Sequence, residues 1–256
     1  EAAKDIVLEG LAPMGEEYIK VLEEGFDNRW IDVYENEGKR SGAYSWGAYG
    51  THPYVLMNYH GTLDHVFTLA HEMGHAIHSY YSDANQPYVN AGYKIFVAEV
   101  ASTCNESLLI QHLLKITEDE EEKTYLINHF LEQFKGTLYR QTMFAEFEKI
   151  THKMVEEGET LTSDILCKVY YDLNKQYFGE DMVLDEEIAL EWARIPHFYN
   201  PFYVYQYATG ISAAIALSKK IMEQGEAGVK DYMKFLTGGG SKDPIDLLKL
   251  AGVDMT

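Results

Sequence analysis

The sequence is poor in cysteine and proline, with two and six among 256 residues, and its 20 glycines follow no three-residue repeat. A collagen-like or disordered chain is thereby excluded. Two cysteines are too few for a disulfide framework, so we interpret Cys104 and Cys167 as thiols of a reducing compartment. No run approaches the roughly 18 apolar residues of a membrane span, and the first ten residues lack the pattern of a signal peptide. We therefore expect a cytoplasmic protein.

Basic side chains are also scarce. The chain has 21 Lys and Arg against 41 Asp and Glu, a formal net charge of −20. Such a charge repels nucleic-acid phosphates and anionic lipids, so we expect neither nucleic acid nor a membrane surface as a partner. With 46% hydrophobic and 24% charged residues, the composition is that of an ordinary globular domain, long enough to bury a sizeable core.

Hydrophobic periodicity predicts a mainly α fold with a small β-sheet. Residues 41–59 are rich in Gly, Tyr and Trp and include the strand-like run at 54–57, which favours a hairpin or a few short strands. In residues 63–81, apolar side chains recur at helical spacing. Further helices are expected at about 14–25, 92–115, 118–157, 163–177, 185–193, 201–223 and 227–236, with a last one from Asp243-Pro244 and a candidate break at Gly136.

The helix at 63–81 carries the motif H-E-x-x-H at residues 71–75. Four residues of α-helix turn about 400°, so His71 and His75 lie on one face and can both reach a zinc ion. Glu72 points beside such an ion, where a base acting on bound water belongs. The alternative is a plain helix surface, but the apolar stripe occupies a different face. Gly74 is unfavourable within a helix, which a close backbone approach would explain.

A hydrolytic zinc site usually has three protein ligands and one open position, so a third ligand is required. Glu99 lies in the apolar stretch 96–102, where a carboxylate without a partner is costly to bury. A cation would be that partner. Ser102, Thr103 and Glu106 share the Glu99 side of the predicted helix, and we expect one of them, Glu106 before the others, to hydrogen-bond a ligand histidine.

His78 and Asp64 each lie seven residues from His71 on the same face of the helix. We interpret both as supporting or surface residues.

Three separated motifs resemble a known family. The segments HEMGHAIH at 71–78, FVAE at 96–99, and PHFY at 196–199 with YVYQYATG at 203–210 are similar to those of oligoendopeptidase F, in the thimet-oligopeptidase family of zinc metallopeptidases. The resemblance covers about Ser41 to Met255. It implies a helical, zincin-type catalytic domain over residues 1–256, a fragment of a longer two-lobed enzyme whose N-terminal lobe is missing.

The resemblance also implies roles for single residues. His71, His75 and Glu99 match the zinc ligands, and Glu72 matches the general base. His197 with Tyr203 and Tyr207 matches the groups that stabilise the oxyanion, with Tyr199 and Tyr205 as alternatives. Gly210 stands where the thimet branch has another tyrosine. Tyr203 and Tyr207 are four residues apart, so their phenols share a helix face.

The expected function is zinc-dependent hydrolysis of internal peptide bonds in short oligopeptides, with zinc-activated water as the nucleophile and Glu72 as the base. The alternatives are a zinc carboxypeptidase or dipeptidase of related helical fold, and a non-catalytic peptide-binding module stiffened by zinc. The run 53–58 is expected to be either an edge strand that pairs with substrate or ordinary sheet. Arg140 and Arg194 are candidates for holding a carboxylate, with structural ion pairs as the other interpretation.

Overall fold

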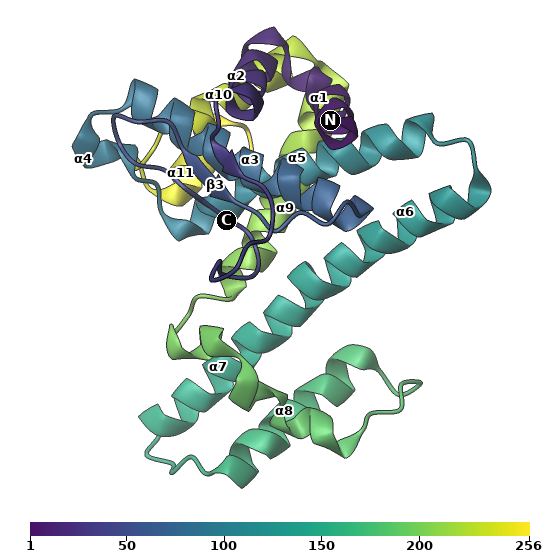
Figure 1. Cartoon of the computed structure of the whole chain (residues 1–256). Helices are drawn as coiled ribbons and strands as arrows, with labels where there is room; N and C mark the ends of the chain where they lie inside the picture. Colours follow the sequence, from purple (N-terminus) through teal and green to yellow (C-terminus); the bar gives the residue numbers. More distant parts are fainter. The chain divides into compact units, whose positions relative to one another are not determined.

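The computed structural model describes all 256 residues (Figure 1). The chain divides into two compact units, one of residues 1–130 with 210–256 and the other of residues 131–209. Helices α6 (Glu120–Gln133) and α9 (Tyr205–Gln224) each begin in one unit and end in the other. Whether residues 1–256 act as one catalytic domain stays a prediction.

The first unit is mainly helical. Its longest helix, α3, begins after Thr62, whose side chain accepts a hydrogen bond from the N–H of His65 and so caps the first turn. The helix extends past the predicted end at residue 81. The helices that lie wholly in this unit are α1 (Ala2–Leu11), α2 (Glu16–Asp27), α3 (Leu63–Asn85), α4 (Tyr88–Ala91), α5 (Ile95–Ile116), α10 (Glu226–Leu236) and α11 (Pro244–Leu250), with a 3₁₀ turn, η1, at Ala12–Met14.

Helices α3 and α5 form the centre of this unit and pack mainly against each other. Met73 and Ile77 of α3 and Val97 and Val100 of α5 are fully buried. The apolar stripe predicted for α3 is confirmed at its core positions, and Tyr80, at its edge, is only partly buried. Side chains of α3 and α5 that flank this helix contact are therefore brought close together.

A three-stranded sheet precedes α3, as predicted. Strands β1 (Ile31–Asp32), β2 (Tyr44–Trp46) and β3 (Tyr54–Leu56) have the order β1-β3-β2, with β1 parallel and β2 antiparallel to β3. Since β3 has a neighbour on both sides, it is ordinary sheet and not an edge strand. The sequence missed β1, because two residues are too few for an alternating pattern. The mainly α class with a small sheet is confirmed.

The second unit is built from helical segments. The predicted helix at 118–157 does not break at Gly136; it continues through a π-helical stretch, because an extra residue can be accommodated without ending the helix. The predicted helix at 185–193 is a 3₁₀ segment. The elements are η2 (Phe134–Tyr139), α7 (Arg140–Glu156), α8 (Ser163–Phe178), η3 (Glu186–Arg194) and η4 (Pro196–Tyr199).

Glu191 links several of these elements. Its carboxylate accepts hydrogen bonds from Arg140, from Arg194 at 2.5 Å and from Tyr170 at 2.6 Å. Both arginines therefore form structural ion pairs, which was one of the two interpretations of the sequence.

No helix of either unit combines the length and the apolarity that crossing a membrane requires.

Candidate metal centre

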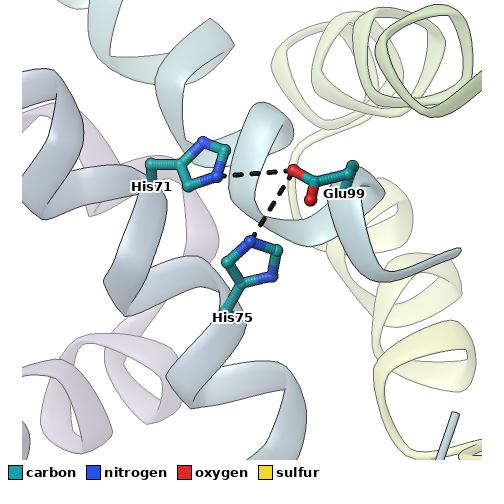
Figure 2. A group of neighbouring side chains, drawn as sticks. All are labelled: His71, His75 and Glu99. Atoms are coloured by element: carbon teal, nitrogen blue, oxygen red, sulfur yellow. Dashed lines mark ion pairs between the residues drawn. The ribbon is translucent and has the colours of Figure 1, made fainter. Parts of the chain in front are cut away.

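His71, His75 and Glu99 converge on one point. The two histidines project from adjacent turns of α3, and Glu99 projects toward them from the start of α5 (Figure 2). Oε2 of Glu99 lies 3.4 Å from Nε2 of His71 and 3.7 Å from Nε2 of His75. One ligand atom from each side chain lies within 4.8 Å of the other two. Residues 24 positions apart in sequence thus form one cluster.

Glycine allows this convergence. A Cβ atom at Gly74 would lie 2.6 Å from the Cα of Ser102 and 2.8 Å from the carbonyl oxygen of Ala101, so the α5 backbone lies directly against α3. The close approach inferred from Gly74 is confirmed. A Cβ at Gly210, in α9, would lie 3.1 Å from the Cβ of Glu99. Helix α5 is therefore packed closely between α3 and α9 near Glu99, and each of these two helices has a glycine at its contact with α5.

Polar neighbours orient the cluster. Nδ1 of His71 hydrogen-bonds Oε1 of Glu106, as expected from the sequence, so that Nε2 of the same ring faces Glu99. Ser102 donates instead to Glu99, with its Oγ 3.3 Å from Oε2. A carboxylate on the far nitrogen of a histidine fixes the ring and its tautomer, which is the usual surrounding of a metal-ligating histidine.

The charges of the cluster shift its pKa values strongly. Burial would lower the pKa of His71, but the carboxylates of Glu106 and Glu99 outweigh it and raise that pKa well above its ordinary value. Burial, helped by the charge of His71, lowers the pKa of His75 to about 4. Burial would raise the pKa of Glu99, but the hydrogen bond from His71 and the charges of both histidines lower it to about 2. The carboxylates of Glu99 and Glu106 thus both lie against the ring of His71 and stabilise its positively charged form.

Glu72 is a buried acid beside this cluster. Glu72 is only 6% exposed, and its Oε2 atom is buried without a hydrogen-bond partner. Burial, reinforced by the charges of Glu99 and Glu106 against that of His71, raises the pKa of Glu72 to about 7. A buried carboxylate oxygen without a partner in the protein requires a ligand or water to satisfy it.

The donor set fits a divalent cation. Two imidazole nitrogens and one carboxylate oxygen are the ligands of many hydrolytic zinc sites, which keep a fourth position open. Tetrahedral ligands about 2.0–2.2 Å from zinc lie roughly 3.4 Å from each other, close to the Glu99–His71 and Glu99–His75 separations. The residues can therefore hold a metal ion with little rearrangement.

The other residues considered on α3 do not join the cluster. His78 is 1% exposed, its ring stacks on Tyr93 at a centroid distance of 3.7 Å, and its Nδ1 has no hydrogen-bond partner. Asp64 lies exposed in the first turn of α3. Both have the supporting or surface positions that the sequence predicted.

Tyr93 contributes to this site without any signal in the sequence. Its hydroxyl lies 2.9 Å from Oγ of Ser79 and 3.5 Å from the carbonyl oxygen of His75, so it ties the segment before α5 to the helix of the ligand histidines. Tyr93 lies outside any helix or strand, and no periodicity relates it to α3.

His197, Tyr203 and Tyr207 form a second group, in the second unit. The ring of Tyr203 lies 5.7 Å from that of His197 and 5.6 Å from that of Tyr207, and the two phenol oxygens are 3.5 Å apart. Tyr199 is largely exposed. The residues that match the oxyanion-binding groups are thus neighbours of each other, and their role stays a prediction.

Comparison with known proteins gives the family context. A model of peptidase family M3 matches residues 2–256. Over its full length the chain is 61% identical to oligopeptidase PepF of Bacillus subtilis, covering 38% of that protein. It is 51% identical over 247 residues to the chromosomal oligoendopeptidase F of Lactococcus lactis subsp. cremoris, covering 96% of this chain and 41% of the relative. The chain thus spans about two fifths of the length of these curated relatives.

A solved structure agrees with these matches. The crystal structure of oligoendopeptidase F from Enterococcus faecium superposes with a TM-score of 0.73 and 40% sequence identity, over 100% of this chain and 39% of the other. The resemblance inferred from the three motifs is therefore confirmed.

Proposed function

The chain belongs to peptidase family M3, and on that premise we propose that it contains the catalytic machinery of a zinc-dependent oligopeptidase that cleaves internal bonds of short peptides. The observation that carries the proposal is the convergence of His71, His75 and Glu99 from two helices, with the buried acid Glu72 beside them. A surface cluster without function would need neither the close helix contact at Gly74 nor the hydrogen bond that His71 donates to Glu106.

We propose that His71, His75 and Glu99 hold zinc. When bound there, the ion supplies Lewis acidity, which lowers the pKa of water and polarises a carbonyl group. Glu106 keeps the ring of His71 turned toward Glu99 through its bond to Nδ1. Ser102 restrains the Glu99 carboxylate.

Glu72 acts as the general base. Its unpartnered Oε2 atom takes a proton from the attacking water and returns it to the amine that leaves. No covalent bond between enzyme and peptide forms in this scheme. His197, Tyr203 and Tyr207 donate hydrogen bonds to the oxyanion that develops on the peptide carbonyl, a role supported by their match to the family motif and by their proximity to each other.

We further propose that residues 1–256 are the catalytic portion of an enzyme with an additional N-terminal lobe, which contributes to the substrate channel. The longer chains of the relatives support this proposal.

We also propose a cytoplasmic location, because Cys104 and Cys167 are both free thiols.

The test compares the full-length protein with its Glu72→Gln variant. We expect Glu72→Gln to bind one zinc ion, as the unaltered protein does, and to lose turnover of an internally quenched peptide by about 100-fold or more. Asp64→Asn is the matched control, because Asp64 lies exposed on the same helix, and it should retain both zinc and turnover. Metal analysis and cleavage rates give the two readouts. Full turnover in Glu72→Gln would remove Glu72 as the base.

Peptides blocked at both ends separate the remaining alternatives. An endopeptidase cleaves them, whereas a carboxypeptidase or dipeptidase requires a free end. A zinc-stiffened binding module would bind such peptides and leave them intact.

A further inference from the structure

A buried carboxylate in the second unit holds the backbone next to Tyr203. Glu148, on α7, is 3% exposed, and its Oε1 accepts a hydrogen bond from the N–H of Phe202 at 3.0 Å. Its other oxygen, Oε2, is buried and has no hydrogen-bond partner. Burying an acid in this way disfavours folding, because a single hydrogen bond from a backbone N–H offsets only part of the cost of desolvating a carboxylate. The presence of Glu148 is therefore better explained by its hydrogen bond to the backbone of Phe202 than by a gain in stability.

Phe202 has a backbone that needs to be held. Its φ of 58° lies in the left-handed region, which residues with a side chain rarely adopt. Its ring packs on His152, one turn beyond Glu148 on α7, at a centroid distance of 4.7 Å. Its carbonyl oxygen lies 3.5 Å from the side-chain amide of Gln206. Strained conformations of this kind persist where the surroundings impose them, and they are frequent at functional sites.

The strained residue directly precedes one of the proposed oxyanion-binding groups. On the other side of Tyr203, Val204 is 1% exposed and belongs to the core of the second unit. The backbone is thus fixed on both sides of Tyr203, by Glu148 before it and by burial after it. Earlier in the chain, Phe198 packs on Phe144 and Phe147 of α7 and so fixes the residue that follows His197. Helix α7 therefore holds both segments that bring Tyr203 against His197.

We propose that Glu148 is a positioning residue, whose carboxylate holds Phe202 in its left-handed conformation and thereby sets the place of Tyr203 relative to His197. The effect on catalysis rests on the proposed function, in which these two side chains act on the oxyanion. The anchoring of Phe202 can be measured independently of catalysis.

The decisive variant is Glu148→Met in the full-length protein. Methionine has a similar size and no charge, so it removes the buried unpartnered oxygen but cannot accept the hydrogen bond of Phe202. We expect a melting temperature equal to or above that of the unaltered protein. Amide hydrogen exchange in residues 199–206 should become at least about tenfold faster. For an internally quenched peptide, kcat should fall by about tenfold or more while KM changes by less than about twofold.

Two further variants complete the test. Glu148→Gln keeps an oxygen that accepts from the N–H of Phe202, so it should restore slow exchange and most of kcat. Glu146→Gln is the control, because Glu146 lies on the same helix and accepts from Tyr177 instead, at 2.8 Å. It should leave exchange at Phe202 and kcat unchanged.

The outcomes are separable. Unchanged exchange in Glu148→Met would overturn the proposal, and so would faster exchange with an unchanged kcat. Failure of Glu148→Met to fold would make Glu148 a residue of stability and would also overturn it. If the unaltered protein cleaved no peptide, the proposed function would fail, and the exchange measurement would still decide whether Glu148 anchors Phe202.

Discussion

Gly74 of α3 lies so close to Ser102 of α5 that a methyl group on the glycine would come within 2.6 Å of the Ser102 Cα. The obstacle is backbone, which cannot move aside as a flexible side chain can. This contact determines how near Glu99, three residues before Ser102, comes to His71 and His75. The metal centre therefore depends on the packing of two helices as much as on its three ligands.

Gly74→Ala should consequently damage both stability and metal binding. Overpacking a tight contact costs about 1–3 kcal/mol, and the better helix propensity of alanine offsets only part of it. We expect a lower free energy of unfolding by about 1–2 kcal/mol and weaker zinc binding. Chemical denaturation and zinc titration measure the two effects. Gly136→Ala is the control, since a Cβ there meets no atom within 4 Å. Equal zinc affinity in Gly74→Ala and the unaltered protein would contradict this account.

Glu106→Gln should weaken metal binding without removing a ligand. The glutamine has the same shape, but it no longer places a negative charge next to Nδ1 of His71. Nε2 of the ring therefore donates its electron pair to a metal ion less strongly. Loss of such a supporting partner typically lowers metal affinity by about 10–100-fold. Competition with a chromogenic chelator provides the measurement. Glu9→Gln serves as the control, because Glu9 pairs with a different histidine, His112, at 3.7 Å. An unaltered zinc affinity in Glu106→Gln would leave Glu106 without the supporting role.

His78 makes stability depend on pH. Burial, with a smaller effect from His75, lowers the pKa of His78 from 6.5 to about 3. Between these two values the unfolded chain binds a proton that the folded protein does not. The contribution of His78 is therefore fully present above pH 6.5 and is lost as the pH falls toward 3.

His78→Phe removes this dependence and keeps an aromatic ring against Tyr93 and Phe235. Relative to the unaltered protein, the variant should gain about 2 kcal/mol in free energy of unfolding between pH 8 and pH 5. Urea denaturation at both pH values, with and without chelator, checks it. A difference between the two proteins that does not change with pH would show that His78 binds its proton in the folded state as well.

Glu191 stabilises the second unit in its charged form. Burial opposes that form, but hydrogen bonds from Tyr170 and Arg140 and the charge of Arg194 lower the pKa of Glu191 below 4.5. Its stabilising contribution is therefore present above pH 4.5 and is lost as the pH falls through the lowered value.

Glu191→Gln should cost about 2 kcal/mol or more at neutral pH, because two arginines lose a buried acceptor charge. The difference from the unaltered protein should shrink as the pH falls below 4.5 and through the lowered pKa of Glu191, because the unaltered protein then loses the charge that the variant already lacks. Thermal unfolding across this pH range provides the measurement. Asp172→Asn breaks only an exposed ion pair with Lys168 and should change the free energy of unfolding by less than about 0.5 kcal/mol. A Glu191→Gln protein as stable as the Asp172→Asn control would contradict the prediction.

Local spacing was enough to predict the helix of His71 and His75 and the face on which both lie. Residues one turn apart share a face in any α-helix, whatever the rest of the fold does. The apolar surroundings of Glu99 likewise indicated a buried carboxylate in need of a partner. Spacing did not predict β1, which is too short for a pattern. It also predicted a helix break at Gly136, where the helix continues through π-helical turns.

Only the tertiary structure decided that Glu99 meets the two histidines, that Glu106 and not Ser102 holds His71, and that β3 is a central strand. Each of these facts depends on how separate elements pack. A contact such as that of Gly74 with Ser102 arises from backbone positions far apart in the sequence, and no periodicity within either helix encodes it. The same holds for Glu148 and Phe202, 54 residues apart. The sequence supplies the chemical groups and their local faces, whereas the distances between them come from packing.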